Sequence, residues 1–212
     1  MGAKLPLGTK RLTLAAVALR PTAAFRRPGH GVLARFGTLN VNGVPTVFGV
    51  VGAVLDRRCR ASWFHVELPM RPNGSTGYVR ADAVSIARVR TRIVVDVSRR
   101  ELSFFRNGRL VLRSRTAVGA SATPTPLGRY YVNQRLVPED PGGPFGPGAI
   151  GISAFSNVLT GWAQGGPVAI HGTNEPWSIG HAVSNGCIRV PNPVLRRLFA
   201  STPAGTPVFI RK

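Results

Sequence analysis

The chain is poor in acidic side chains and in cysteine, and it lacks a long apolar run. Its 212 residues include 8 Asp and Glu against 28 Lys and Arg, which gives a formal net charge of +20. Two cysteines, Cys59 and Cys187, are too few for a disulfide framework, although one bridge between them stays open. No stretch reaches the roughly 18 apolar residues of a membrane-spanning helix, so we expect no transmembrane segment.

The positive charge favours an anionic partner, because basic surfaces attract polyanions over long range. The arginines stand mostly alone or in pairs such as Arg26-Arg27, Arg57-Arg58 and Arg99-Arg100, with no basic run interleaved with aromatics. Nucleic-acid binding is therefore not expected. An anionic surface or polymer fits the same charge, and so does a solvated basic surface without a special partner.

The composition favours a folded protein with many turns. Apolar residues make up 43% of the chain and include 10 Phe and 3 Trp, enough for a packed core. Glycine (25) and proline (18) are frequent and follow no collagen-like period, which indicates short strands joined by turns. The fold class predicted is mostly β.

The first half predicts a small β-rich unit. Leu12–Leu19 is interpreted as its first strand; the alternative, a short signal-peptide core after Lys4, Lys10 and Arg11, lacks a convincing cleavage site. Trp63–Leu68 alternates large apolar and polar-capable side chains, as a half-buried strand does. The ending Trp63…Gly77-Tyr78-Val79-Arg80 resembles the last hairpin of bacterial Src-homology-3-like barrels. This resemblance predicts a small β-barrel domain over residues 12–87.

The second half, residues 90–212, predicts further strands and one helix. Asn107-Gly108 stands between two apolar runs, which is the strongest local signal for a hairpin with a type I′ turn. The Pro- and Gly-rich segment 138–148 predicts a long functional or mobile loop. For the helix, Asn192 is the expected N-cap and Pro193 the first helical residue.

A histidine and a cysteine are the candidate reactive groups. His171 ends the apolar run Val168–Ile170 and precedes Gly172, while Cys187 follows Gly186 and precedes an apolar residue. A nearby imidazole can take the thiol proton and so generate the nucleophilic thiolate. Spacing alone leaves two other interpretations open: an inert core cysteine, or a metal site with His181 as a further ligand.

Three ordered motifs carry a specific resemblance. His171-Gly172-Thr173, then Ser184-Asn185-Gly186-Cys187-Ile188-Arg189, and the upstream Thr123–Tyr130 segment are similar to the signature of YkuD-type L,D-transpeptidases. The resemblance covers about residues 90–212. It implies an L,D-transpeptidase β-sandwich with short helices, here preceded by the small barrel. It also implies that Cys187 stays a free thiol.

The same resemblance implies a role for each motif residue. Cys187 would be the nucleophile, His171 the proton acceptor and donor, and the Gly172 carbonyl would orient the imidazole. The backbone amides of Gly186 and Cys187 would form an oxyanion hole. Ser184, Asn185 and Arg189 would contact substrate, with a structural ion pair as the alternative for Arg189. Many relatives have His where this chain has Asn185. No cofactor and no metal are expected.

The implied activity is cross-linking of peptidoglycan stem peptides through a cysteine thioester, in an extracytoplasmic location at the cell envelope. Anionic wall polymers are an additional expected partner. Two alternatives stay open from the sequence. The thioester could be released by water, as in an L,D-carboxypeptidase, or the chain could be a non-catalytic wall-binding module.

Overall fold

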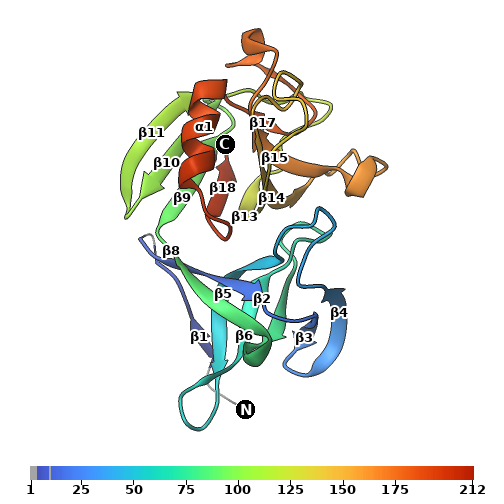
Figure 1. Ribbon diagram of the computed structural model, residues 1–212, viewed down its shortest axis with the longest axis vertical. Coiled ribbons are helices and arrows are strands. Elements are labelled where there is room, and N and C mark those ends of the chain that lie inside the picture. The colour runs from blue at the N-terminus through green and yellow to red at the C-terminus, as the bar shows by residue number, and fades with distance from the viewer. Residues whose placement is uncertain (1–3, 10) are drawn as a thin grey trace.

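Two eight-stranded sheets, each made from one half of the chain, build the fold (Figure 1). The computed structural model describes residues 4–9 and 11–212. The described chain is mostly β, as predicted, and contains one α-helix. The first sheet contains β1 (Lys4–Pro6), β2 (Thr13–Ala18), β3 (Thr22–Arg27), β4 (His30–Phe36), β5 (Val47–Leu55), β6 (Ala61–Glu67), β7 (Thr76–Arg80) and β8 (Val84–Val89).

The first sheet has the order β4-β3-β7-β6-β5-β2-β8, with β1 paired to β5. Its core contains the fully buried side chains of Phe48 and Val66. The apolar run 12–19 contains β2 and is not the first strand. The strand β1 precedes it in the chain and also pairs with β5. The strands extend beyond the predicted limits of 12 and 87. The division into a barrel domain and a second domain stays a prediction.

The second sheet encloses the larger core. Its strand order is β11-β10-β9-β18-β13-β14-β15-β17, and helix α1 (Asn192–Ser201) buries Leu195 and Leu198 in the same core. The short strands β12 (Val118–Gly119) and β16 (Ala182–Ser184) pair separately. The remaining bounds are β9 (Thr91–Asp96), β10 (Glu101–Arg106), β11 (Arg109–Arg115), β13 (Gly128–Leu136), β14 (Ala149–Phe155), β15 (Pro167–His171), β17 (Ile188–Arg189) and β18 (Pro207–Arg211).

The predicted Asn-Gly hairpin is confirmed. Asn107 and Gly108 connect β10 to β11 and have φ values of 52° and 80°. Two consecutive positive φ values are what a type I′ turn requires, and asparagine and glycine adopt them at low cost.

The N-cap prediction for the helix is wrong. Pro191 occupies the N-cap position, and no side chain caps the helix there. The Asn192 side chain instead bonds the backbone of Thr173, accepting from its N–H at 2.8 Å and donating to its C=O at 3.0 Å. The Asn192 side chain therefore makes a tertiary contact and does not cap the helix.

Direct hydrogen bonds join the two sheets. The Tyr131 hydroxyl on β13 donates to the Val47 carbonyl on β5 at 3.0 Å, and both residues are buried. The Asn73 side chain exchanges two hydrogen bonds with the Phe155 backbone, at 2.8 and 2.9 Å. These contacts involve buried or half-buried groups, so the halves are held in one arrangement.

The described part of the chain contains no helix with the length and hydropathy that a membrane span requires.

Replacing Tyr131 by Phe should destabilise the protein by about 1–3 kcal/mol, because it leaves a buried carbonyl without its donor. Urea unfolding measures this change. Tyr130→Phe is the matched control, since the Tyr130 hydroxyl bonds the Leu127 carbonyl three residues away and joins no sheets. A Tyr131→Phe free energy of unfolding equal to the wild-type value would contradict this role.

Candidate active site

Parallel pairing of β15 with β17 places the predicted nucleophile and base on one face. Ile170 pairs with Ile188, and His171 pairs with Arg189. Side chains alternate between faces along a strand, so Cys187, one residue before β17, lies on the same side as Ala169 and His171. Residues sixteen apart in the sequence thus become diagonal neighbours. The Cys187 thiol is free and half-buried.

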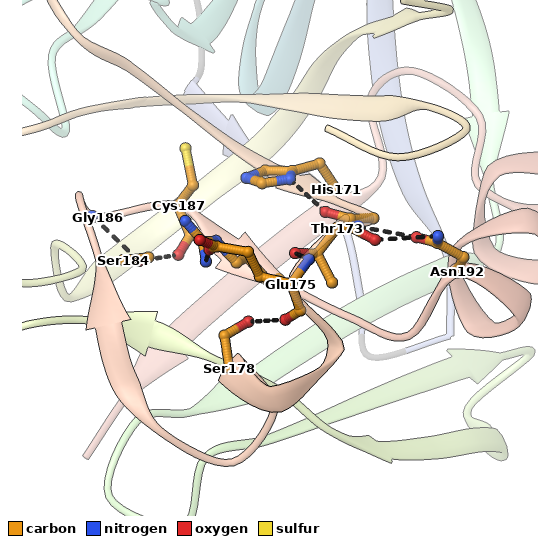
Figure 2. Close-up of polar contacts among 10 residues, drawn as sticks. His171, Thr173, Glu175, Ser178, Ser184, Gly186, Cys187 and Asn192 are labelled. Carbon is orange, nitrogen blue, oxygen red and sulfur yellow. Dashed lines mark hydrogen bonds and ion pairs between the residues drawn. The ribbon is translucent and has the colours of Figure 1, made fainter. Parts of the chain in front are cut away.

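A backbone carbonyl fixes the tautomer of the buried His171. Nδ1 lies 2.6 Å from the Gly172 oxygen. A carbonyl can only accept a hydrogen bond, so Nδ1 carries the proton and Nε2 keeps its lone pair. Figure 2 shows this second nitrogen on the side of the ring that faces Cys187. The Gly172 carbonyl therefore makes the hydrogen bond to His171 that its predicted orienting role requires.

Both reactive groups are neutral in the resting site. Burial lowers the pKa of His171 to about 4; the Gly172 carbonyl opposes this shift and the Arg189 charge adds to it. Burial raises the pKa of the Cys187 thiol, against the smaller lowering effects of a backbone hydrogen bond from Ala169 and of the Arg189 charge. The low pKa makes His171 a weak base, and the raised pKa keeps the Cys187 thiol protonated. A resting thiolate–imidazolium pair is therefore disfavoured.

Asn192 holds the segment that carries the base (Figure 2). Its two hydrogen bonds to Thr173 fix the backbone next to Gly172. A Cβ on Gly172 would lie 2.3 Å from the Asn192 side-chain oxygen, and one on Gly146 would lie 2.5 Å from the same atom. The two glycines thus permit the close approach of Asn192, which in turn locates the carbonyl that orients His171.

Ser184 organises the turn that presents Cys187. Its hydroxyl donates to the Cys187 carbonyl at 2.5 Å and accepts from the Gly186 N–H at 3.2 Å (Figure 2). Gly186 has φ of 107°, in the region that favours glycine. Because the Gly186 amide already donates to Ser184, it is occupied in this conformation. The role predicted for it in an oxyanion hole would require that bond to be exchanged.

Arg189 forms the ion pair that was one of its two predicted roles. Its Nη1 pairs with the Glu175 carboxylate, and the Arg189 side chain is 18% exposed. Glu175 is held in turn, since its N–H donates to the Thr173 hydroxyl at 2.9 Å and its C=O accepts from Ser178. One guanidinium nitrogen is therefore engaged, and substrate binding by Arg189 stays a prediction.

The predicted long loop reaches the site. Phe145, in segment 138–148, packs its ring edge-on against His171 with 5.0 Å between ring centroids. It is 46% exposed, so it shields one side of the imidazole while still facing solvent.

The other predicted residues lie at the margin. The Asn185 and His181 side chains are exposed. Cys59 is an exposed free thiol in the first half and forms no disulfide. Within residues 4–9 and 11–212, no group of three or more His, Cys, Asp and Glu could hold a metal ion.

A neutral thiol beside an oriented imidazole can act as a cysteine nucleophile with its base. Comparison with known proteins identifies the family. The family model for the YkuD-type L,D-transpeptidase catalytic domain matches residues 90–210. The chain therefore belongs to the L,D-transpeptidase family.

Named relatives are similar over the same part of the chain. The Bacillus subtilis protein YkuD, named as an L,D-transpeptidase, is 37% identical over 57% of this chain and 65% of its own length. The Bacillus licheniformis YkuD is 39% identical over 56% of this chain and 64% of its own. A solved Enterococcus faecium L,D-transpeptidase is 26% identical with a TM-score of 0.45, covering 57% of this chain and 49% of that one. The chain thus spans just under two thirds of the two Bacillus proteins.

Three residues of the site were not identified from the sequence. Asn192 was assigned to the helix end, Glu175 was only one of several acids that could pair with Arg189, and Phe145 lay in a loop of undefined path. Asn192 and Glu175 follow His171 at irregular spacing, so no periodicity marked them. The contacts of Asn192 with Thr173 and of Glu175 with Arg189 follow from the tertiary structure and not from the sequence pattern.

Asn192→Ala should slow acylation of Cys187 by up to about 100-fold, because a small displacement of a catalytic group can cost that much. Single-turnover acylation by a β-lactam, followed by mass spectrometry, measures the rate. Asn174→Ala is a suitable control, since this exposed side chain lies in the same segment. Equal rates for the Asn192 variant and the wild type would show that the Thr173 contact does not position the base.

Proposed function

We propose that this chain is a peptidoglycan L,D-transpeptidase that transfers an acyl group through a thioester on Cys187. The observation that carries the proposal is the His171 imidazole: its Nδ1–H is committed to Gly172, and its free nitrogen faces the thiol. A silent wall-binding module would have no need of this arrangement. Family membership and the named Bacillus relatives support the same activity.

The first half of the reaction forms the thioester. The thiol sulfur attacks the carbonyl at the L-centre of a donor stem peptide while Nε2 of His171 takes the thiol proton. The tetrahedral intermediate collapses, the bond to the terminal D-residue breaks, and the leaving amine takes the proton from His171. The Cys187 amide is the first candidate for the oxyanion donor, because the Gly186 amide is occupied by Ser184.

The second half releases the acyl group to an amine. An acceptor amine attacks the thioester, His171 takes its proton, and the Cys187 sulfur leaves and is reprotonated. Attack by water would give the carboxypeptidase outcome instead. Phe145, packed on His171, excludes part of the solvent from one side of the imidazole, which favours transfer over hydrolysis. The activity places the protein outside the cytoplasm, at the cell envelope.

A carbapenem-type β-lactam should form a one-to-one covalent adduct on Cys187 of the full chain, detected by intact-mass and peptide mass spectrometry. Cys187→Ala should abolish the adduct, whereas Cys59→Ala should retain it. His171→Ala should slow acylation by about 10²–10⁴-fold, and His181→Ala should leave the rate near that of the wild type. No adduct on folded wild-type protein, or an adduct that survives Cys187→Ala, would refute the mechanism.

The pH dependence follows from the two pKa shifts. The reactive form contains neutral His171 and protonated Cys187, so acylation should be constant around neutral pH and fall as pH drops through the His171 pKa of about 4. Rates of β-lactam acylation measured across this range give the profile. A half-maximal rate at about pH 6.5, the ordinary histidine value, would mean that the imidazole is not buried in the reacting enzyme.

A further inference from the structure

A group of arginines that the proposed reaction does not use lies along the outer face of the second sheet, the β10–β11 hairpin and the segment that holds Arg11. We call it the arginine face. It lines three adjoining hollows, the first of about 250 Å³ between the two halves, and adjacent hollows share Arg11 or Arg92. Its members are Arg11, Arg92, Arg99, Arg106, Arg109, Arg113, Arg129 and Arg211.

Strand alternation places Arg92, Arg113, Arg129 and Arg211 on the outward side of the sheet. Arg106 and Arg109 pair with each other beside the β10–β11 turn, and Arg106 also pairs with Thr91, so these two arginines flank the end of the hairpin instead. On β9, Ile93 and Val95 are fully buried in the core, so Arg92 and Val94 point outward. The neighbouring strands align in register with β9: Phe209 pairs with both Val94 and Arg129. The outer face therefore presents guanidinium groups around apolar side chains, on a rigid sheet.

The charge of the arginine face is only partly balanced. Three carboxylates lie beside it: Glu67 is 3.0 Å from Arg129, Glu101 is 3.2 Å from Arg113, and Asp96 is 4.0 Å from Arg211. Within the part of the chain that the structure describes, the guanidinium groups of the other five form no ion pair with a carboxylate within 4.0 Å: Arg11, Arg92, Arg99, Arg106 and Arg109.

Two of the guanidinium groups lie over aromatic rings. Arg92 is 4.4 Å from the centre of the Phe105 ring, and Arg129 is 5.8 Å from that of Phe209. The Nε of Arg92 is buried and has no hydrogen-bond partner. Stacking restrains the guanidinium plane and leaves its edge for a ligand, and this edge matches the oxygens of a phosphate. Arg92 is therefore held over the ring, and because its Nε is buried, a ligand would have to contact the terminal nitrogens of the guanidinium group.

We propose that the arginine face binds a linear envelope polymer whose negative charges are phosphodiesters. Charges that extend from the cleft between the halves to the β10–β11 hairpin fit a chain with repeated phosphates better than a single ion. The extracytoplasmic location, which rests on the proposed function, favours a wall polymer over nucleic acid. The face would hold the enzyme at the wall.

Binding of a fluorescently labelled poly(glycerol phosphate) chain to the full-length protein, measured by anisotropy across salt concentrations, tests this inference. The variant Arg99→Gln/Arg106→Gln/Arg109→Gln removes three exposed charges that form no ion pair. Affinity should fall about tenfold or more, and the slope of log affinity against log salt should fall by about one per lost contact. The single variant Arg92→Gln should weaken binding of the polymer while leaving the charges of the β10–β11 hairpin in place.

The control Arg27→Gln/Arg57→Gln/Arg58→Gln makes the same change in net charge on exposed residues of the first half. It should retain affinity within about threefold. An equal loss in both triple variants would show that net charge alone attracts the polymer, and would overturn the inference. Single-stranded DNA of equal charge that binds as tightly, with the same sensitivity to the variants, would overturn the choice of polymer.

Cys187 acylation by a carbapenem should be equal in the wild type and both triple variants. A wild type that binds the polymer but is not acylated would refute the proposed transpeptidase and leave the arginine face intact. A wild type that is acylated but does not bind the polymer would refute the inference on the arginine face and leave the proposed transpeptidase intact.

Discussion

The parallel pairing of β15 with β17 is the constraint on which the site depends. It brings two segments separated by a long loop into register, with Ile170 beside Ile188 and His171 beside Arg189. Alternation of side chains then places the Cys187 thiol and the His171 imidazole on one face. Because β17 has only two residues, its pairing with β15 needs support from other contacts. Asn192, which joins helix α1 to Thr173, supports the pairing from the side.

Burial decides the electrostatics of the pair more than any neighbouring charge does. It keeps the imidazole neutral and the thiol protonated, and Arg189, the nearby cation, is itself paired with Glu175. A neutral resting pair limits unwanted reactions of the thiol, since the thiolate is the reactive form. In the proposed reaction, proton transfer therefore has to accompany attack, and the fixed His171 tautomer leaves Nε2 to accept the proton.

Local chemistry in the sequence predicted much of this structure. The Asn107-Gly108 hairpin and the mostly β fold follow from side-chain type and order. The roles of Cys187, His171 and Gly172 come from the family resemblance and stay predictions. The rest depends on tertiary pairing. Asn192 has the features of an N-cap, yet its side chain bonds Thr173; the Gly186 amide was expected to face substrate, yet it bonds Ser184. Short polar side chains can satisfy several partners, and only the packed structure decides which one they bond.

Analysis of the reaction products distinguishes acyl transfer from hydrolysis and from an inactive site. The full-length protein would be incubated with a disaccharide–tetrapeptide donor and an isotopically labelled acceptor stem peptide, and the products identified by mass spectrometry. We expect loss of the terminal D-residue, an acyl-enzyme on the peptide that contains Cys187, and a cross-linked product that carries the label. Release of the disaccharide–tripeptide without labelled cross-link would identify a hydrolase, and recovery of unchanged donor would contradict catalysis by this site.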